Sequence, residues 1–196
     1  MKLKSKLILP IIILSCFFIG MVKAEYVEHP ITNITVVSGT YVLGDLLSLQ
    51  EVDGDLYTIN EILGVNPLSV EFEINTSIPN AVNHIIKVYC RYEGNPAHEI
   101  NLDVFNWTSK SWFTVIQLTE HEFEWNNYSV PIRHDDFVNV TTIRGRINHI
   151  SNGANGHFLD IDYIRIWEFV DRGGIHWTTL LIIGIIVLIG VISFGR

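Results

Sequence analysis

The clearest strand signal in the chain is the stretch HFLDIDYIRIW at residues 157–167. Its first half alternates apolar residues with Asp160 and Asp162, and successive side chains of a strand point to opposite faces. After Tyr163 the apolar residues occupy the other alternate positions. This shift of one residue predicts a long or central strand with a β-bulge near residues 163–164.

The same two-residue period recurs through the middle of the chain. It appears in further segments at residues 70–74, 86–92, 100–104, 112–118, 127–132 and 143–147. Turn-forming Gly, Asn and Pro residues separate these segments, and none of them carries the apolar stripe of an amphipathic helix. Roughly eight or nine short strands predict an all-β domain, an antiparallel β-sandwich of the jelly-roll type.

Two apolar blocks flank these strands. Residues 1–24 have a basic start, an uncharged run and Ala24 before a cut at Glu25, which is the layout of a secretory signal peptide. A retained N-terminal anchor is the alternative, but the run is short for a membrane span. Residues 175–194 contain no Asp, Glu, Lys or Arg and are long enough to cross a bilayer as a helix.

These blocks predict the domain organisation and the location of the protein. We expect a cleaved signal peptide at residues 1–24, an extracytoplasmic β-sandwich at 25–171, and a transmembrane anchor with a minimal tail at 172–196. The protein would be a single-pass protein of the cell membrane or envelope. Its domain would lie outside and its C-terminus inside.

Charge and cysteine content narrow the chemistry of residues 25–171. All 21 Asp and Glu residues lie there against seven Lys and Arg residues, a formal charge of −14. Such a surface repels a phosphate backbone, so we expect no nucleic-acid partner. It is compatible with cations, especially calcium, although an acidic surface also simply favours solubility. Cys90 is the one cysteine of this region, so we expect no internal disulfide and a buried thiol.

The order of several short motifs resembles a known family. Gly39-Thr40, Ser48-Leu49 and Asp53-Gly54 precede the run YTINE at residues 57–61, and the domain closes on LDIDYIRI at residues 159–166. This order resembles the galactose-binding-like jelly rolls, including family 6 and related carbohydrate-binding modules. The resemblance covers roughly residues 38–168, and the closing strand carries most of it.

The resemblance implies a structural calcium site. In the carbohydrate-binding relatives a closing Asp joins acidic residues of an early strand, and Asp162 matches that closing Asp. Asp53, Asp55 and Glu61 are stand-ins for the early acids, and Asp160 is a further candidate ligand. Alternatively, Asp53 and Asp55 are ordinary turn residues and Asp162 accepts hydrogen bonds from backbone amides.

Tryptophan residues supply candidate ligand-binding positions. Trp107, Trp112 and Trp125 lie close together in the sequence. An exposed tryptophan stacks well on the apolar face of a sugar ring, so Trp107 and Trp125 are candidates for binding a glycan. The alternative places Trp112 in the core and makes Trp107 the cap of a turn.

Histidine residues recur in two similar segments. RYEGNPAHEINL at residues 91–102 and RINHISNGANGHFLDI at residues 146–161 each place a histidine, His98 or His157, at the start of a strand after a Gly/Asn turn. We interpret both segments as hairpins and expect the two histidines on the rim of a binding site. With His149 they could form a zinc site if the three converge, but the sequence shows no fourth ligand.

Five Asn-x-Ser/Thr sequons accompany the export signal. They start at Asn33, Asn75, Asn106, Asn127 and Asn139. Each predicts N-glycosylation in a host that has the machinery.

No catalytic motif stands out. The chain has no nucleophile elbow, no HExxH and no phosphate-binding loop. We therefore expect a membrane-anchored extracytoplasmic module that binds a glycan or another surface ligand, not an enzyme. The alternative is a structural cell-surface or envelope protein that acts through protein–protein contacts without a small ligand, and an anchored hydrolase is a third candidate.

Overall fold

The computed structural model describes residues 25–77, 83–95, 98–118, 124–132 and 135–170. Contacts divide the chain into two units, one of Tyr26–Phe169 and another of Met1–Glu25 with Val170–Arg196. The predicted signal peptide and transmembrane anchor lie outside the described residues. Within the described ranges, no helix is long and apolar enough to cross a membrane.

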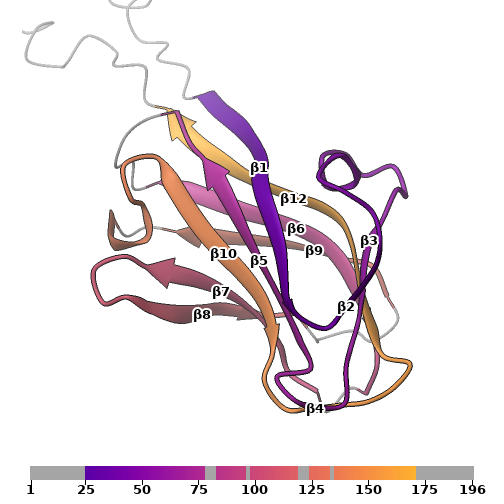
Figure 1. Cartoon of the computed structure of the whole chain (residues 1–196). Coiled ribbons are helices and arrows are strands. Elements are labelled where there is room, and N and C mark those ends of the chain that lie inside the picture. The colour runs from indigo at the N-terminus through magenta and orange to yellow at the C-terminus, as the bar shows by residue number, and fades with distance from the viewer. Residues whose placement is uncertain (1–24, 78–82, 96–97, 119–123, 133–134, 171–196) are drawn as a thin grey trace, which may run out of the picture. The chain divides into compact units, whose positions relative to one another are not determined.

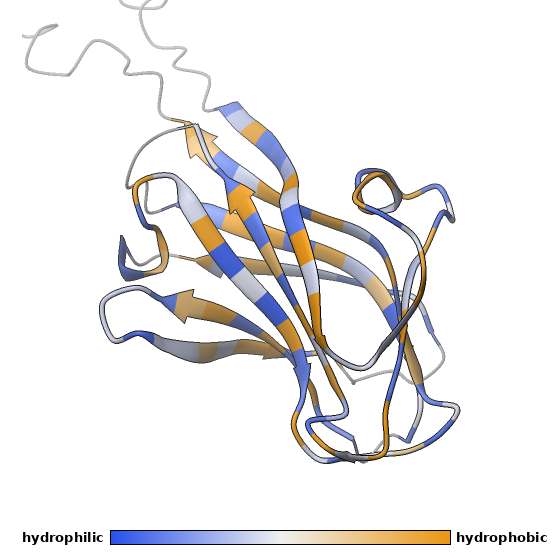
Figure 2. Cartoon of the chain, viewed as in Figure 1, coloured by the Kyte–Doolittle hydropathy of each residue, from blue (hydrophilic) through white to orange (hydrophobic). Residues whose placement is uncertain are grey.

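The unit Tyr26–Phe169 is all β, as predicted (Figure 1). Apolar and polar residues alternate along its strands, which are antiparallel in each recorded pair (Figure 2). Two short 3₁₀ turns, η1 (Leu47–Leu49) and η2 (Asp135–Phe137), join strands. The strands are β1 (Glu25–Ser38), β2 (Thr40–Leu43), β3 (Tyr57–Asn60), β4 (Gly64–Val65), β5 (Leu68–Asn75), β6 (His84–Glu93), β7 (Ile100–Asn106), β8 (Ser111–Gln117), β9 (Asn126–Ile132), β10 (Thr142–His149), β11 (Asn152–Gly153) and β12 (Phe158–Val170).

Two layers of strands form the sandwich. One layer has the order β2-β3-β12-β6-β9, and the other has the order β5-β10-β7-β8. In the strand order, β1 lies between β12 and β5 and so connects the layers. Figure 1 shows β5, β10, β7 and β8 in front of β12, β6 and β9. The side chains between the layers make the core.

The core is tightly packed at several points. Phe72 of β5 is 1% exposed, and a Cβ added to Gly145 of β10 would lie 2.1 Å from its ring. Glycine at this position therefore lets the ring lie directly on the backbone of the neighbouring strand. Cys90 is buried, as predicted, and burial raises the pKa of its thiol to about 12. The thiol thus stays protonated and inert at neutral pH.

β12 confirms the prediction made from residues 157–167. It pairs with β6 from Phe158 to Glu168 on one side and with β3 from Phe158 to Ile161 on the other. Its register on β6 shifts between Ile161 and Tyr163, which confirms the predicted bulge. The residue without a partner in β6 is Asp162.

The two predicted hairpins are wrong. β6 pairs with β12 and β9, whereas β7 pairs with β10 and β8, so the β6–β7 connection crosses from one layer to the other. The connection from β10 to β12 crosses in the same way. Alternation identifies a strand with one buried face, but it does not identify the neighbour of that strand. Each of the two similar segments therefore contains a connection that crosses between the layers, and not a hairpin.

Candidate functional site

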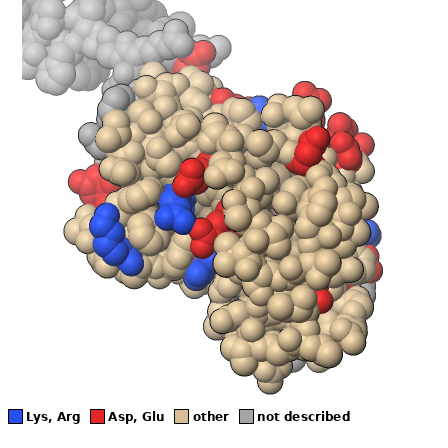
Figure 3. All heavy atoms as spheres, viewed as in Figure 1, with Lys and Arg blue, Asp and Glu red and all other residues tan. Residues whose placement is uncertain are grey.

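The outward side of the β5-β10-β7-β8 layer carries the candidate site. Arg146 lies opposite Glu71 of β5 and Asp103 of β7, and Phe105 of β7 lies opposite Trp112 of β8. Figure 3 shows basic and acidic side chains close together on this side. We call this surface the aromatic–arginine face and define it by Glu71, Asp103, Phe105, Trp112, Arg144 and Arg146.

Ion pairs hold the two arginines of the aromatic–arginine face. Arg146 donates to Asp103 Oδ2 from Nε at 3.0 Å and from Nη2 at 2.5 Å. The Thr114 hydroxyl donates to Asp103 Oδ1 at 2.7 Å. Arg144 Nη2 donates to Glu71 Oε2 at 2.6 Å. Because these contacts already restrict the side chains, less conformational freedom remains to be lost when a ligand binds.

Both guanidinium groups also lie over aromatic rings. The Arg146 guanidinium carbon is 4.5 Å from the centroid of Trp112, and that of Arg144 is 5.2 Å from the centroid of Phe105. The rings of Phe105 and Trp112 meet edge to face at 5.2 Å. Trp112 is half-buried on the outward side of β8, so the alternative that places it in the core is wrong.

This arrangement suits a polyhydroxylated ring. A sugar offers an apolar face of C–H groups and an edge of hydroxyls that both donate and accept hydrogen bonds. Aromatic rings complement that apolar face, while carboxylates and guanidinium groups complement the edge. A phosphorylated ligand would meet the carboxylates of Glu71 and Asp103 as well as the two arginines, so these carboxylates would offset its attraction to the guanidinium groups.

The predicted tryptophan positions belong to different surfaces. Trp107 follows β7 and packs edge to face on Phe105 at 5.1 Å, so it borders the aromatic–arginine face. Its indole Nε1 is buried and has no hydrogen-bond partner within the described ranges. Trp125 precedes β9 in the other layer, where it stacks on Tyr89 at 5.0 Å with the Arg91 guanidinium 5.1 Å from its ring.

The predicted histidine positions do come together, but away from Trp107. His98 precedes the first residue of β7 and Trp107 follows its last, so the length of β7 separates them. His98 lies 4.7 Å from His149 and 5.0 Å from His157 between ring centroids. The three histidines thus converge, as the zinc alternative requires.

The predicted calcium ligands Asp53 and Asp162 lie next to each other. The Gly54 amide donates to Asp162 Oδ1 at 3.1 Å, and the Asp55 amide donates to Asp53 Oδ1 at 3.0 Å. Burial raises the pKa of the Asp162 carboxyl, although hydrogen bonds from the backbone of Gly54 and Asp53 act against that rise. The closing strand and the early turn are therefore adjacent, as the resemblance implies.

Asp160, the further candidate ligand, has other partners. Its Oδ2 accepts from Arg91 Nε at 2.9 Å and lies 2.8 Å from Arg91 Nη2. Its Oδ1 accepts from the Thr58 hydroxyl at 2.5 Å. The β-bulge explains the separation, because it turns Asp162 away from the ladder in which Asp160 lies opposite Arg91.

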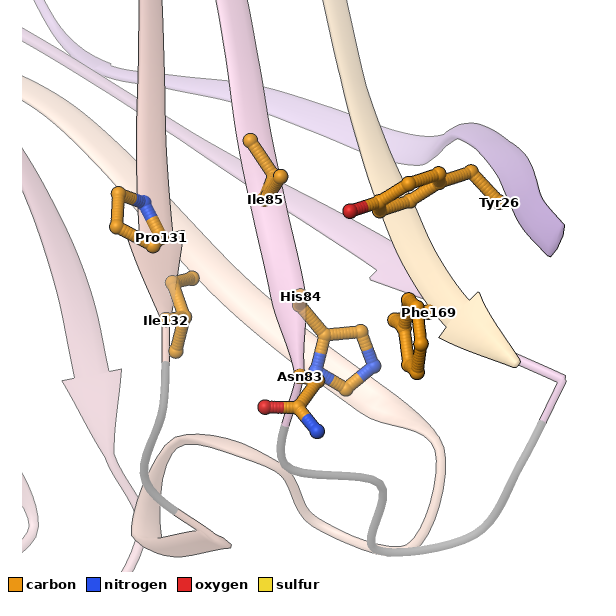
Figure 4. A pocket seen from close by; sticks show the side chains of 7 residues that line it. All are labelled: Tyr26, Asn83, His84, Ile85, Pro131, Ile132 and Phe169. Atoms are coloured by element: carbon orange, nitrogen blue, oxygen red, sulfur yellow. The ribbon is translucent and has the colours of Figure 1, made fainter. Parts of the chain in front are cut away.

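A cavity of about 320 Å³ lies among the first residues of β1 and β6 and the last residues of β9 and β12 (Figure 4). Ile85, Pro131, Ile132 and Phe169 give it apolar walls, and Tyr26, Asn83 and His84 complete the lining. Among the described residues that line it there is no charged pair and no arginine. The aromatic–arginine face is therefore the better candidate for a glycan.

The predicted glycosylation positions differ in exposure. Asn33, Asn75, Asn127 and Asn139 are exposed. Asn106 is 9% exposed, and its Oδ1 accepts a hydrogen bond from the Ser109 amide at 2.8 Å. We therefore expect modification at the four exposed positions in preference to Asn106.

The sequence did not single out the charged residues of the aromatic–arginine face. Glu71 and Glu73 alternate with apolar residues in β5, and Arg144 and Arg146 do so in β10. This alternation predicts outward side chains, but it does not show that β5 and β10 are neighbours.

Comparison with known proteins gives structural similarity without sequence similarity. No protein-family model matches the sequence, and no curated protein matches it either. The structure is similar to that of a Clostridium thermocellum endo-1,4-β-D-xylanase 10B fragment, CBM22-1 with GH10 modules, complexed with xylohexaose. The two share 10% identity at a TM-score of 0.50, over 78% of this chain and 29% of that chain.

Two single modules are also similar. The xylan-binding module CBM15 has 10% identity and a TM-score of 0.48 over 74% of this chain and 97% of its own. A family 29 carbohydrate-binding module from Piromyces equi has 11% identity and a TM-score of 0.45 over 75% and 92%. At such identities a likeness concerns the fold alone. The match to the xylanase fragment confirms the predicted galactose-binding-like jelly roll.

Proposed function

We propose that the unit Tyr26–Phe169 is a non-catalytic glycan-binding module and that the aromatic–arginine face is its binding surface. The observation that carries this proposal is the contact of Trp112 and Phe105 with two arginines fixed by Asp103 and Glu71. Such a surface offers stacking area and directed hydrogen bonds together, which is what recognition of a sugar requires.

The proposal includes the place from which the module works. A signal peptide at residues 1–24 and an anchor at 172–196 would hold it on the outer side of a membrane, facing surface glycans. Calcium bound by Asp53, Asp55 and Asp162 would stabilise the turn beside β12. The strongly acidic composition supports a cation there, because it would relieve the repulsion among these carboxylates.

The binding proposal is tested with the purified full-length chain on a glycan array, followed by titration with the oligosaccharides that bind. We expect Trp112→Ala to weaken binding roughly tenfold or more, since a buried aromatic anchor contributes about 1.4 kcal/mol or more. Trp125→Ala is the matched control, because it removes the same side chain from the other layer and should leave affinity unchanged.

Two results would reject this surface. If Trp125→Ala abolishes binding and Trp112→Ala does not, the glycan binds the β12-β6-β9 layer. If no glycan binds and the folded chain instead associates with itself or with a protein, the structural alternative holds.

A further inference from the structure

Five polar side chains meet at one end of the sandwich, at the opposite end of β7 from Trp107. We call them the histidine cluster: Glu61, Tyr92, His98, His149 and His157. Glu61 follows β3, Tyr92 lies near the end of β6, and His98 precedes β7. His149 is the last residue of β10, and His157 precedes β12.

The crossing connections bring these residues together. Glu93 at the end of β6 pairs with Phe158 at the start of β12, and His149 pairs with Ile100 at the start of β7. The Glu61 amide donates to the carbonyl of His157 at 2.9 Å. Residues that are distant in the sequence are therefore held side by side by the backbone of both layers.

The Nδ1 atoms of the three histidines lie near the Glu61 carboxylate or the Tyr92 hydroxyl, and the hydroxyl also lies 3.2 Å from His157 Nδ1. His149 Nδ1 lies 2.5 Å from Glu61 Oε1, and His157 Nδ1 lies 3.3 Å from Glu61 Oε2. His98 Nδ1 lies 3.0 Å from the Tyr92 hydroxyl oxygen, which in turn donates to Glu61 Oε1 at 2.7 Å. One potential ligand atom from each of Glu61, His98 and His149 lies within 4.8 Å of the others.

We propose that the histidine cluster is a zinc site, with Glu61, His98, His149 and His157 as its four ligands. Zinc takes four ligands tetrahedrally, at about 2.0–2.2 Å, so the ligand atoms lie roughly 3.3–3.6 Å apart. The two printed distances between these ligand atoms, 2.5 Å from His149 Nδ1 and 3.3 Å from His157 Nδ1 to the Glu61 carboxylate oxygens, lie near this value. Glu61 is the fourth ligand that the sequence does not reveal, because it is distant from all three histidines.

The surroundings of the ligands fit this assignment. A histidine that binds metal through one ring nitrogen commonly donates a hydrogen bond from the other. With Nδ1 on the metal, His149 would donate from Nε2, which lies 2.7 Å from the Ser151 hydroxyl oxygen. The Ala154 amide donates to Glu61 Oε2 at 3.1 Å and orients the carboxylate. Gly94 lies so close to Tyr92 that a Cβ there would come within 2.3 Å of the hydroxyl oxygen, so glycine at this position leaves room for the tyrosine.

The buried charge of Glu61 favours a cation here. The side chains of Glu61 and His149 are both 0% exposed, so the carboxylate has no water to compensate its charge.

The ligand types select among cations. Imidazole suits zinc, copper and nickel, whereas calcium prefers oxygen ligands alone. A closed set of four protein ligands, without an open position, is typical of a structural site. Zinc would tie together the chain after β3, the β6–β7 crossing and the β10–β12 crossing, in a domain whose single cysteine excludes an internal disulfide.

The test is zinc binding by the purified full-length chain after treatment with a chelator. We expect one zinc ion per chain by elemental analysis, a rise in melting midpoint on adding zinc, and a shell of nitrogen and oxygen at about 2.0–2.1 Å in X-ray absorption. His98→Asn should lower zinc affinity by more than 100-fold, because even the loss of a supporting contact costs about 10–100-fold. His98 suits this test because it is only half-buried.

His29→Asn is the matched control. His29 also contacts a buried carboxylate, Glu168 Oε2 at 2.8 Å, but it lies outside the histidine cluster, so its loss should leave zinc affinity unchanged. Absence of zinc from the folded wild-type chain would overturn the proposal, and so would equal affinity in folded His98→Asn. X-ray absorption of the wild-type chain still decides the matter if the variant does not fold. The proposal is independent of glycan binding, since Trp112→Ala should keep its zinc.

Discussion

Single buried residues decide how the ends of this sandwich are built. Glu61 has a side chain that is 0% exposed, and its carboxylate accepts hydrogen bonds from the Tyr92 hydroxyl and the Ala154 amide. At the other end, His84 is 1% exposed, and neither of its ring nitrogens has a hydrogen-bond partner within the described ranges. Glu61 is stabilised by its hydrogen-bond donors, whereas burying His84 without hydrogen bonds lowers the stability of the fold.

Removing the Tyr92 hydroxyl should measure how much its hydrogen bond to Glu61 stabilises the fold. Tyr92→Phe deletes a hydrogen bond to a buried carboxylate and should lower the free energy of unfolding by about 1.5–3 kcal/mol. Tyr128→Phe is the control, because its hydroxyl donates to the neutral carbonyl of Leu118 at 2.6 Å and should cost only about 0.5–1.5 kcal/mol. Urea unfolding of both variants tests this, and equal losses would contradict it.

Acid should destabilise the domain through His84. Burial lowers the pKa of this imidazole from 6.5, although nearby Glu168 acts to raise it and His29 to lower it further. Below about pH 6.5 the unfolded chain therefore binds a proton that the folded chain does not, and stability falls as pH falls. His84→Phe should show a smaller loss of stability between pH 7 and pH 5 in urea titrations. An unchanged pH dependence would exclude His84 as the cause.

Among the elements, β12 determines most of the local geometry. It lies between β3 and β6, and its bulge at Asp162 directs a carboxylate onto the turn at residues 53–55. Asp160, only two residues away, stays in the ladder opposite Arg91. One irregular residue therefore separates two carboxylates that regular alternation would place on one face.

Calcium is expected to act through this bulge. If Asp162, Asp53 and Asp55 bind it, a hundredfold excess over the dissociation constant should stabilise the native state by about 2.7 kcal/mol. Thermal melting of the full-length chain with calcium and then with chelator measures the effect. Asp162→Ala should abolish the response and Asp160→Asn should keep it. A wild-type melting midpoint that calcium does not change would contradict a calcium site at these residues.

The alternating strands could be predicted from the sequence, because one buried face leaves a two-residue period in β5, β6, β7, β10 and β12. β1 could not, since its buried and exposed residues do not alternate strictly and it includes Pro30. Pairing partners were also beyond prediction, which is why the two crossings were interpreted as hairpins. The convergence of Glu61 with three histidines depends on those crossings, and so does the composition of the aromatic–arginine face.

For the whole molecule, the proposed topology makes a direct prediction. Protease added to intact cells should degrade residues 25–171, because the domain would lie outside the membrane. The protein should also remain with the membrane in carbonate extraction, because residues 175–194 would span it. A cytosolic protein of the same cells serves as the protection control. Recovery of the chain in the soluble cytosolic fraction would contradict this topology.

The pairing of β12 with β6 and β3 has a mechanical consequence. A force applied to the C-terminal end of β12 acts along the strand, while its hydrogen bonds to β6 and β3 run across it. The load is therefore shared by both ladders in shear, and their bonds must break together instead of opening one after another. The rate of forced unfolding depends on the unfolding barrier, so a strand loaded in this way resists tension well. If the proposed anchor at residues 172–196 held the module against a bound glycan, the module should keep its binding surface intact under flow.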